Sequence, residues 1–218
     1  DAADPAYVMG IGNNPETAGG SLRYTYSSPT TPTTTYDYAF ESGVRELRKR
    51  DPVLGDFNPE HYVAEFRFVT ARDGTRVPVS LLYRKGTKLD GSAPLYQYAY
   101  GSYGLTSEPS FRSGILSLVD RGFVYAIAHI RGGEEMGRAW YEDGKLMKKV
   151  NSFNDFIDVT RVLVKEKVAD PRRVFALGYS RGGMMALLAA REGAPHLAIA
   201  TVGAPTDLRS ARSAADAG

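Results

Sequence analysis

The sequence contains no cysteine, a single tryptophan and only three histidines among its 218 residues. Without cysteine the chain cannot form disulfides, use a thiol nucleophile or bind a metal through thiolates. No apolar run approaches the ~18 residues that a membrane-spanning helix needs. The 27 basic and 25 acidic residues leave a net charge of +2, which lacks the basic excess typical of nucleic-acid-binding proteins. We therefore predict no nucleic-acid partner, no membrane partner, no metal and no cofactor.

The remaining composition is that of an ordinary globular protein, with 43% hydrophobic and 24% charged residues. A chain of this length fits one large α/β domain, or one domain plus a part of another. It begins with the acidic segment 1–4, which lacks an initiating Met and does not have the pattern of a signal peptide. We therefore expect a fragment or a processed product.

The first 55 residues predict antiparallel β-structure. Residues 10–20 form a loop rich in Gly, Asn and Pro. Three segments alternate with period two and are rich in β-branched or aromatic residues, namely 21–26, 34–40 and 44–49. The basic cluster 45–50 is either a binding patch or the solvated face of a strand, and we favour the solvated strand.

The pattern changes after residue 56. Residues 62–70 and 76–84 predict a hairpin with its turn at 72–75. From about residue 93 onward, compact apolar segments alternate with segments of helical period, which indicates a right-handed parallel α/β sheet. The expected strands are 95–100, 123–130, 174–177 and 198–202, and the expected helices are 113–121, 154–167 and 182–192.

A G-x-S-x-G motif at 178–182 lies between a predicted buried strand and a predicted helix. This is the setting of a nucleophile elbow, in which small residues allow the serine to occupy a sharp strand-to-helix turn. The N-terminus of the following helix favours the negative charge that develops during acyl transfer. We predict that Ser180 is a nucleophile. The alternative is a tight turn in a non-catalytic domain.

A serine nucleophile needs a carboxylate and a histidine base, which follow the serine in this type of site. The only histidine after Ser180 is His196, at the far end of the predicted helix and so ~15 Å away, and we expect it to be a surface residue. Asp207 follows a predicted strand and is a candidate acid. His129 ends a buried strand and is expected to be packed and hydrogen-bonded, and His61 has no catalytic context. The triad is incomplete.

Ordered blocks of sequence upstream of the G-x-S-x-G motif resemble those of a known family. They include Y-A-Y-G-S-Y-G at 98–104, H-I-R-G-G-E-E-M-G at 129–137 and N-S-F-N-D-F at 151–156. Residues 7 to about 168 resemble the oligopeptidase B branch of the prolyl oligopeptidase family of serine peptidases. The part after about residue 168, and 177–208 in particular, more closely resembles acylaminoacyl-peptidase-like hydrolases.

The resemblance implies a β-propeller joined to an α/β-hydrolase domain. Residues 1–55 would be the last propeller strands and the linker. Residues 56–218 would be the N-terminal part of an incomplete α/β-hydrolase domain, a parallel-rich sheet with flanking helices that includes the nucleophile elbow. The resemblance also implies that the Tyr100 hydroxyl and the Arg181 backbone N–H bind the oxyanion, although the family usually has a small residue where Arg181 stands. The family's catalytic Asp and His, and the acidic residues that recognise Arg or Lys, would lie beyond Gly218.

Together these features predict a serine peptidase that forms an acyl-enzyme on Ser180 with short peptides. The resemblance implies that it cleaves them after Arg or Lys. Because no clear His and Asp partners follow Ser180, we expect little activity from the chain alone. One alternative is an esterase-like α/β hydrolase acting on short esters. Another is a catalytically incomplete fragment with a structural or interaction role, whose open sheet edge after 198–202 would favour self-association or a partner chain that completes the sheet. We expect a cytoplasmic location.

Overall fold

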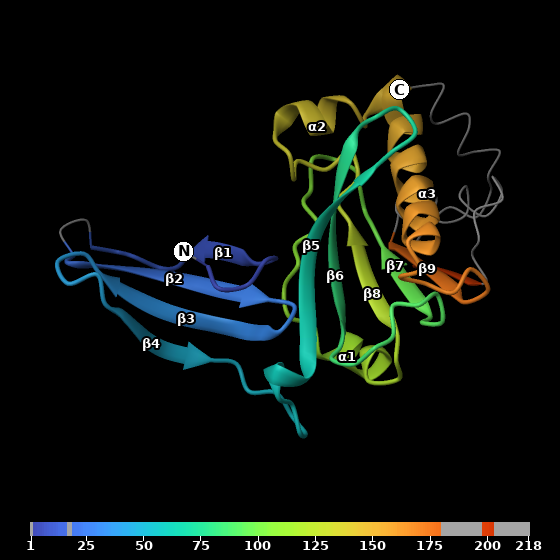
Figure 1. The fold of residues 1–218 in the computed structure, drawn as a ribbon. Helices are drawn as coiled ribbons and strands as arrows, with labels where there is room; N and C mark the ends of the chain where they lie inside the picture. Colours follow the sequence, from blue (N-terminus) through green and yellow to red (C-terminus); the bar gives the residue numbers. More distant parts are fainter. Residues whose placement is uncertain (1, 17–18, 180–197, 203–218) are drawn as a thin grey trace.

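Two β-sheets dominate the computed structural model, which describes residues 2–16, 19–179 and 198–202. One is four-stranded with the order β1-β2-β3-β4, and the other is six-stranded with the order β10-β9-β7-β8-β6-β5. Figure 1 shows the four-stranded sheet projecting to one side of the six-stranded sheet and its helices. The predicted fold class, an incomplete α/β-hydrolase sheet preceded by antiparallel strands, is confirmed.

The four-stranded sheet is antiparallel throughout. Its strands are β1 (Val8–Ile11), β2 (Ser21–Ser28), β3 (Thr31–Ala39) and β4 (Arg45–Arg50). The period-two alternation in β2 and β3 brings tyrosines of the two strands together, and the rings of Tyr24 and Tyr36 stack with their centroids 5.5 Å apart. The sequence does not predict β1, because four residues are too few for an alternation to stand out from a loop.

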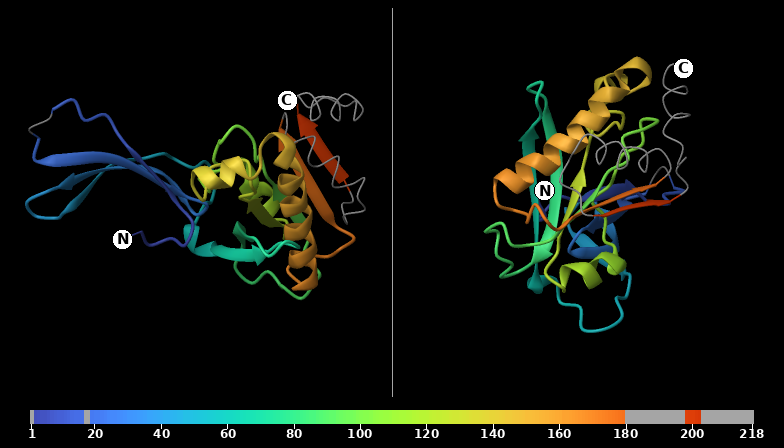
Figure 2. Two further views of the ribbon diagram at one scale, coloured as in Figure 1. Left: turned by 90° about the horizontal axis from the view of Figure 1, so that it is seen from above. Right: turned by 90° about the vertical axis from the view of Figure 1, so that its right-hand side faces the viewer.

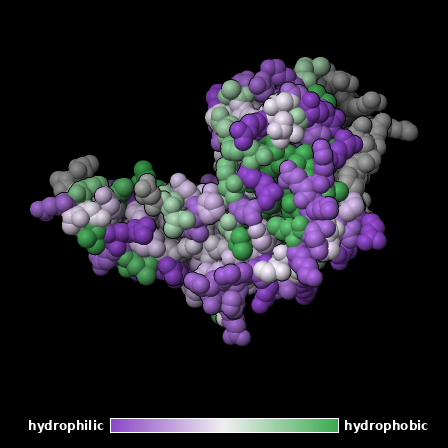
Figure 3. Space-filling view, viewed as in Figure 1, coloured by the Kyte–Doolittle hydropathy of each residue, from purple (hydrophilic) through white to green (hydrophobic). Residues whose placement is uncertain are grey.

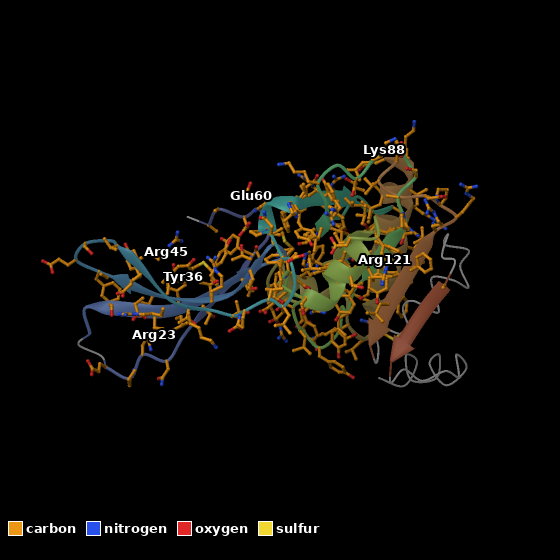
Figure 4. All side chains as sticks on the ribbon, turned by 90° about the horizontal axis from the view of Figure 1, so that it is seen from below. Arg23, Tyr36, Arg45, Glu60, Lys88 and Arg121 are labelled. Atoms are coloured by element: carbon orange, nitrogen blue, oxygen red, sulfur yellow. The ribbon has the colours of Figure 1, made fainter. Side chains whose placement is uncertain are left out.

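The basic cluster is a solvated strand, since all six residues of β4 are exposed. Two arginines, Arg23 and Arg48, each place Nε 2.7 Å from a carboxylate oxygen of Asp37. The hydrogen bond from Arg23 holds the pKa of Asp37 well below its usual value. The guanidinium of Arg45 lies over the ring of Tyr36, 5.0 Å from its centroid (Figure 4). These arginines therefore make contacts within their own sheet.

The six-stranded sheet begins with the predicted hairpin. Strands β5 (Tyr62–Thr70) and β6 (Arg76–Arg84) pair in antiparallel register along their whole length. Gly74 takes a φ of +86° in the turn between them, a conformation that a residue with a Cβ rarely adopts. The remaining strands, β7 (Leu95–Tyr98), β8 (Val124–Ala128), β9 (Val174–Tyr179) and β10 (Ala198–Val202), are parallel to one another.

Helices cover both faces of this sheet, and the views in Figure 2 separate them. On one face, Phe156 and Leu163 of α3 (Lys149–Lys165) pack with a cluster that includes Leu81 of β6. On the other face, α1 (Ser113–Val119) packs with a cluster that includes the next residue of β6, Leu82. Neighbouring residues of one strand therefore serve two separate cores, because side chains alternate across a strand. This produces a three-layer α/β arrangement.

The observed helices differ from the predicted ones, and α1 and α3 each end two residues earlier than expected, at Val119 and Lys165. The helix α3 begins at Lys149 rather than at residue 154, since its first turn is polar and has no apolar periodicity to reveal it. The short helix α2 (Arg138–Glu142) was not expected. Two 3₁₀ turns, η1 (Pro59–His61) and η2 (Leu146–Lys148), complete the described elements. The predicted helix 182–192 lies outside the described residues.

The loop that follows β7 joins the six-stranded sheet to the four-stranded one. The backbone N–H of Phe111, in the loop after β7, donates to Oγ of Ser27 in β2 at 2.9 Å. Hydrophobic residues also reach the surface of both sheets (Figure 3), among them Phe68 of β5, which is 39% exposed and partly covered by the guanidinium of Arg76. Among the described helices, none has the length and apolar character to cross a membrane.

Candidate active site

The predicted site residues are divided between the described and the undescribed parts of the chain. Ser180, Arg181 and Asp207 lie outside the described residues, as does His196. Tyr100 is described and is half-buried, two residues past the end of β7. The described part of the site therefore consists of Tyr100 and the strands that lead to it and to the nucleophile motif.

Strands β7 and β9 are parallel neighbours at the centre of the six-stranded sheet. Tyr98, the last residue of β7, pairs with Leu177 of β9, and β9 ends at Tyr179, immediately before Ser180 in the sequence. Parallel strands that pair in this way end at the same edge of the sheet. In open α/β sheets, ligands bind outside the carboxyl ends of the strands, so this edge is the expected location of a site.

The chain turns sharply after Tyr100. Gly101 has a φ of +60°, and a Cβ at this position would lie 2.5 Å from Cγ1 of Ile130. Gly132 is equally constrained, because its Cβ would lie 2.1 Å from the carbonyl oxygen of Gly101. The N–H of Gly104 donates to the carbonyl oxygen of Gly132 at 3.0 Å. The turn at residues 100–104, the Tyr100 turn, is therefore packed backbone to backbone against the loop that follows β8. Only glycine permits such a close approach of two backbones.

A buried ion pair fixes that second loop. Arg131 is 6% exposed, and its Nε lies 2.9 Å from Oδ2 of the fully buried Asp155 on α3. Its Nη2 contacts both Oδ1 of Asp155 and, at 2.8 Å, Oδ2 of Asp73 in the hairpin turn. Burial raises the pKa of Asp155, and the hydrogen bonds from Arg131 oppose that rise. One side chain thus connects the β5–β6 turn, the β8 loop and α3.

The amino end of α3 also reaches the Tyr100 turn. The Nζ of Lys149 donates to the carbonyl oxygen of Gly101, to Oγ of Ser102 at 2.9 Å and to Oγ of Ser152 at 3.3 Å. The sequence does not single out Lys149, because one lysine in the run 148–149 carries no motif and no periodic signal. A lysine with three donors can hold several acceptors of a loop at once.

His129 is a packed, hydrogen-bonded residue, as predicted. It is 4% exposed, and its Nε2 lies 2.8 Å from Oγ of Ser80 on β6. The indole N–H of Trp140 donates to its carbonyl oxygen at 3.0 Å. His61 lies in the turn η1 and is exposed.

A cavity of about 300 Å³ lies beside this region, between residues 5–8 and the loops that follow β7 and β8. Three buried polar atoms border it and have no hydrogen-bond partner in the described structure: Oγ of Ser107, Nδ1 of His129 and Oε2 of Glu135. Oε1 of Glu135 accepts the backbone N–H of Ser107 at 2.8 Å, so the carboxylate connects the two loops. The described residues contain no group of three side chains suited to holding a metal ion.

Comparison with known proteins settles the family. The profile of the prolyl oligopeptidase family of peptidases matches residues 109–217, which is half of the chain. The chain belongs to the prolyl oligopeptidase family. The family predicted from the motifs at 98–104 and 129–137 is therefore confirmed. The profile also covers the segment 177–208, which contains the predicted nucleophile.

Two relatives are similar to this chain over most of its length. A dipeptidyl aminopeptidase BI of Pseudoxanthomonas mexicana is 54% identical over 185 residues, which are 84% of this chain and 25% of that protein. Protease 2 of Moraxella lacunata is 35% identical over 182 residues, 84% of this chain and 26% of that protein. The chain thus spans about a quarter of the length of these relatives.

Solved structures of the family have the same fold as the described residues. Oligopeptidase B from Leishmania major superposes with a TM-score of 0.84 at 36% identity, covering 92% of this chain and 28% of that one. Oligopeptidase B from Trypanosoma brucei, in a closed form with covalently bound antipain, gives 0.85 at 38% identity, covering 92% and 29%. The two-sheet arrangement of this chain is therefore shared with solved members of the family.

Proposed function

We propose that Ser180 is the nucleophile of a serine peptidase of the prolyl oligopeptidase family, and that the Tyr100 hydroxyl and the Arg181 backbone N–H bind the oxyanion. The parallel pairing of β7 with β9 is the observation that carries this proposal. It supports a common sheet edge for the turn that contains Tyr100 and for the residue that follows Tyr179. Donors aimed at a developing oxyanion are usually the largest single contribution to acyl transfer.

The proposed reaction is acyl transfer in two steps. Oγ of Ser180 loses its proton to a base and bonds to the peptide carbonyl carbon, whose oxygen becomes negative between the two donors. The C–N bond then breaks, the amine leaves with the proton, and water hydrolyses the resulting ester. In this proposal the base and its carboxylate come from family positions beyond Gly218, with Asp207 as the alternative acid.

We also propose that residues 1–55 are the end of a β-propeller and its linker, and that residues 56–218 begin the hydrolase domain. Two observations support a boundary there. Residues 51–58 contain no helix or strand, and Leu54 is 96% exposed. The substrates proposed are short peptides. A preference for Arg or Lys before the cleaved bond rests on the resemblance to oligopeptidase B.

Labelling with a fluorophosphonate probe tests the nucleophile. The complete gene product should be labelled, and a Ser180→Ala variant should not be. The isolated 218-residue chain is compared in parallel, and we expect weak labelling because it lacks an evident base. If the complete protein reacted equally well with and without Ser180, another residue would be the nucleophile and the proposal would be wrong.

A non-catalytic role is the competing proposal, and the position of β10 favours it. In the described part of the chain, β10 is the last strand of the six-stranded sheet and pairs only with β9. An unpaired strand edge favours pairing with more chain or with a second copy. Absence of labelling, together with concentration-dependent association in sedimentation velocity experiments, would support this role over peptidase activity.

A further inference from the structure

The turn that carries Tyr100 is attached to the start of α3 through Lys149. The ammonium of Lys149 donates to the carbonyl oxygen of Gly101 and to Oγ of Ser102, the two residues that directly follow Tyr100. Lys149 is the first residue of α3 and is half-buried. A charged donor makes stronger hydrogen bonds than a neutral one, so these contacts restrain the turn more than ordinary backbone contacts would.

The lysine is itself held by a buried serine. Oγ of Ser152, one turn further along α3, accepts a hydrogen bond from Nζ of Lys149 at 3.3 Å and donates its own proton to the carbonyl oxygen of Arg131. Ser152 is fully buried, and Arg131 is fixed by its ion pair with Asp155. The ammonium therefore connects a rigid buried network to the Tyr100 turn.

The turn needs such a restraint because of its own sequence. Gly101 lies next to Tyr100, and glycine has access to more backbone conformations than any other residue. The direction of the Tyr100 side chain therefore depends on what holds the Gly101 peptide in place. In an enzyme site, a displacement of ~1 Å at a group that contacts the reacting atoms can lower the rate ~10²-fold.

We propose that Lys149 is a positioning residue, which fixes the Tyr100 hydroxyl for oxyanion binding by holding the Gly101 carbonyl and the Ser102 hydroxyl against the start of α3. This inference rests on the proposed function of Tyr100. It assigns to Lys149 no contact with substrate. Its effect on turnover should be exerted through Tyr100 alone.

Kinetics of single variants in the complete gene product give the first test. Lys149→Met keeps most of the apolar stem and removes the donors, and kcat for a fluorogenic arginyl peptide should fall about 10- to 100-fold. KM should stay unchanged, since the oxyanion exists only in the transition state. Lys148→Met is the matched control, because Lys148 is exposed and its Nζ lies 2.7 Å from Oδ1 of Asp143, away from the turn after Tyr100. It should retain wild-type kcat.

A double-mutant cycle with Tyr100→Phe gives the decisive test. If Lys149 acts through Tyr100, adding Lys149→Met to the Tyr100→Phe variant should lower kcat by less than about twofold, because the group to be positioned is already gone. Effects that multiply, or a Lys149→Met variant with wild-type kcat, would overturn the inference. A purely structural lysine would lower kcat in both backgrounds alike.

Folding and the proposed function are checked separately. Circular dichroism and thermal unfolding are followed for every variant. If Lys149→Met does not fold, the cycle is repeated with Ser102→Ala, which removes one acceptor of Lys149 and should show the same non-additivity with a smaller loss. A wild-type protein without Ser180-dependent labelling contradicts the proposed function. If the wild type is active but the losses from Lys149→Met and Tyr100→Phe multiply, the role of Lys149 is wrong and the proposed function stands.

Discussion

The guanidinium of Arg131 and the carboxylate of Asp155 form a buried ion pair, with Nε 2.9 Å from Oδ2 and side chains that are 7% and 0% exposed. The backbone N–H of Arg131 donates to the same oxygen at 3.0 Å. The pair connects the loop after β8 to α3. Because the Tyr100 turn packs against that loop, the ion pair indirectly holds the candidate site in place.

Removing one member of this pair should be costly. Asp155→Ala leaves the buried Arg131 with only the partly exposed Asp73 as a partner, and we expect a loss of about 3–5 kcal/mol in the free energy of unfolding. Chemical denaturation measures it. Glu142→Ala is the control, because it removes a partly exposed surface partner of Arg138 and Lys145 and should cost less than about 1 kcal/mol. Equal losses in the two variants would mean that the buried pair contributes no more to stability than a surface ion pair.

The close approach of Gly132 to the Tyr100 turn gives a second prediction. Gly132→Ala introduces a Cβ at a φ of +100° and 2.1 Å from the carbonyl oxygen of Gly101. Gly86→Ala introduces one at a similar φ of +88° but with no atom within 4 Å. The control should lose about 1–2 kcal/mol from backbone strain. Gly132→Ala should lose more, measured by thermal unfolding, and similar losses would show that the contact is easily relieved.

Acid stability should depend on Asp170, at the turn before β9. The side chain of Arg172, and to a smaller extent its backbone N–H, donate hydrogen bonds that lower the pKa of Asp170 to about 2. A carboxylate with a lowered folded-state pKa adds stability above its unfolded pKa, and this is lost as the pH falls through the folded value. Unfolding free energy should therefore decrease between about pH 4 and pH 2. The Asp170→Asn variant should be less stable at pH 7, and its free energy of unfolding should change less with pH across that window. An unchanged acid profile would contradict this assignment.

Tyr100 is tested by removing only its hydroxyl. Under the proposed function, Tyr100→Phe in the complete gene product should lower kcat about 10²-fold, the usual cost of losing one oxyanion donor. Its thermal unfolding should match wild type. Tyr103→Phe is the matched control, since Tyr103 lies in the same loop and is 61% exposed. If Tyr100→Phe retained full turnover, the hydroxyl would have no part in oxyanion binding.

Local sequence patterns were sufficient for most strands. The hairpin at 62–70 and 76–84 was predicted with its bounds, because two strand-like segments flank an Asp-Gly turn. Strands buried on both faces were recognised as apolar runs, and β7 and β8 lie inside the predicted ranges. The pattern failed where elements are short or begin with polar residues, as in β1, α2 and the first turn of α3.

The sequence by itself determined the family, the order of most of the described strands, and the G-x-S-x-G motif that predicts acyl transfer. These depend on residues close together in the chain, where periodicity and turn chemistry act. The tertiary structure alone decided that Arg131 meets Asp155 and that Lys149 holds the turn after Tyr100. Such pairs form across packed elements, and in a sequence a charged residue looks the same whether it is solvated or buried against its partner.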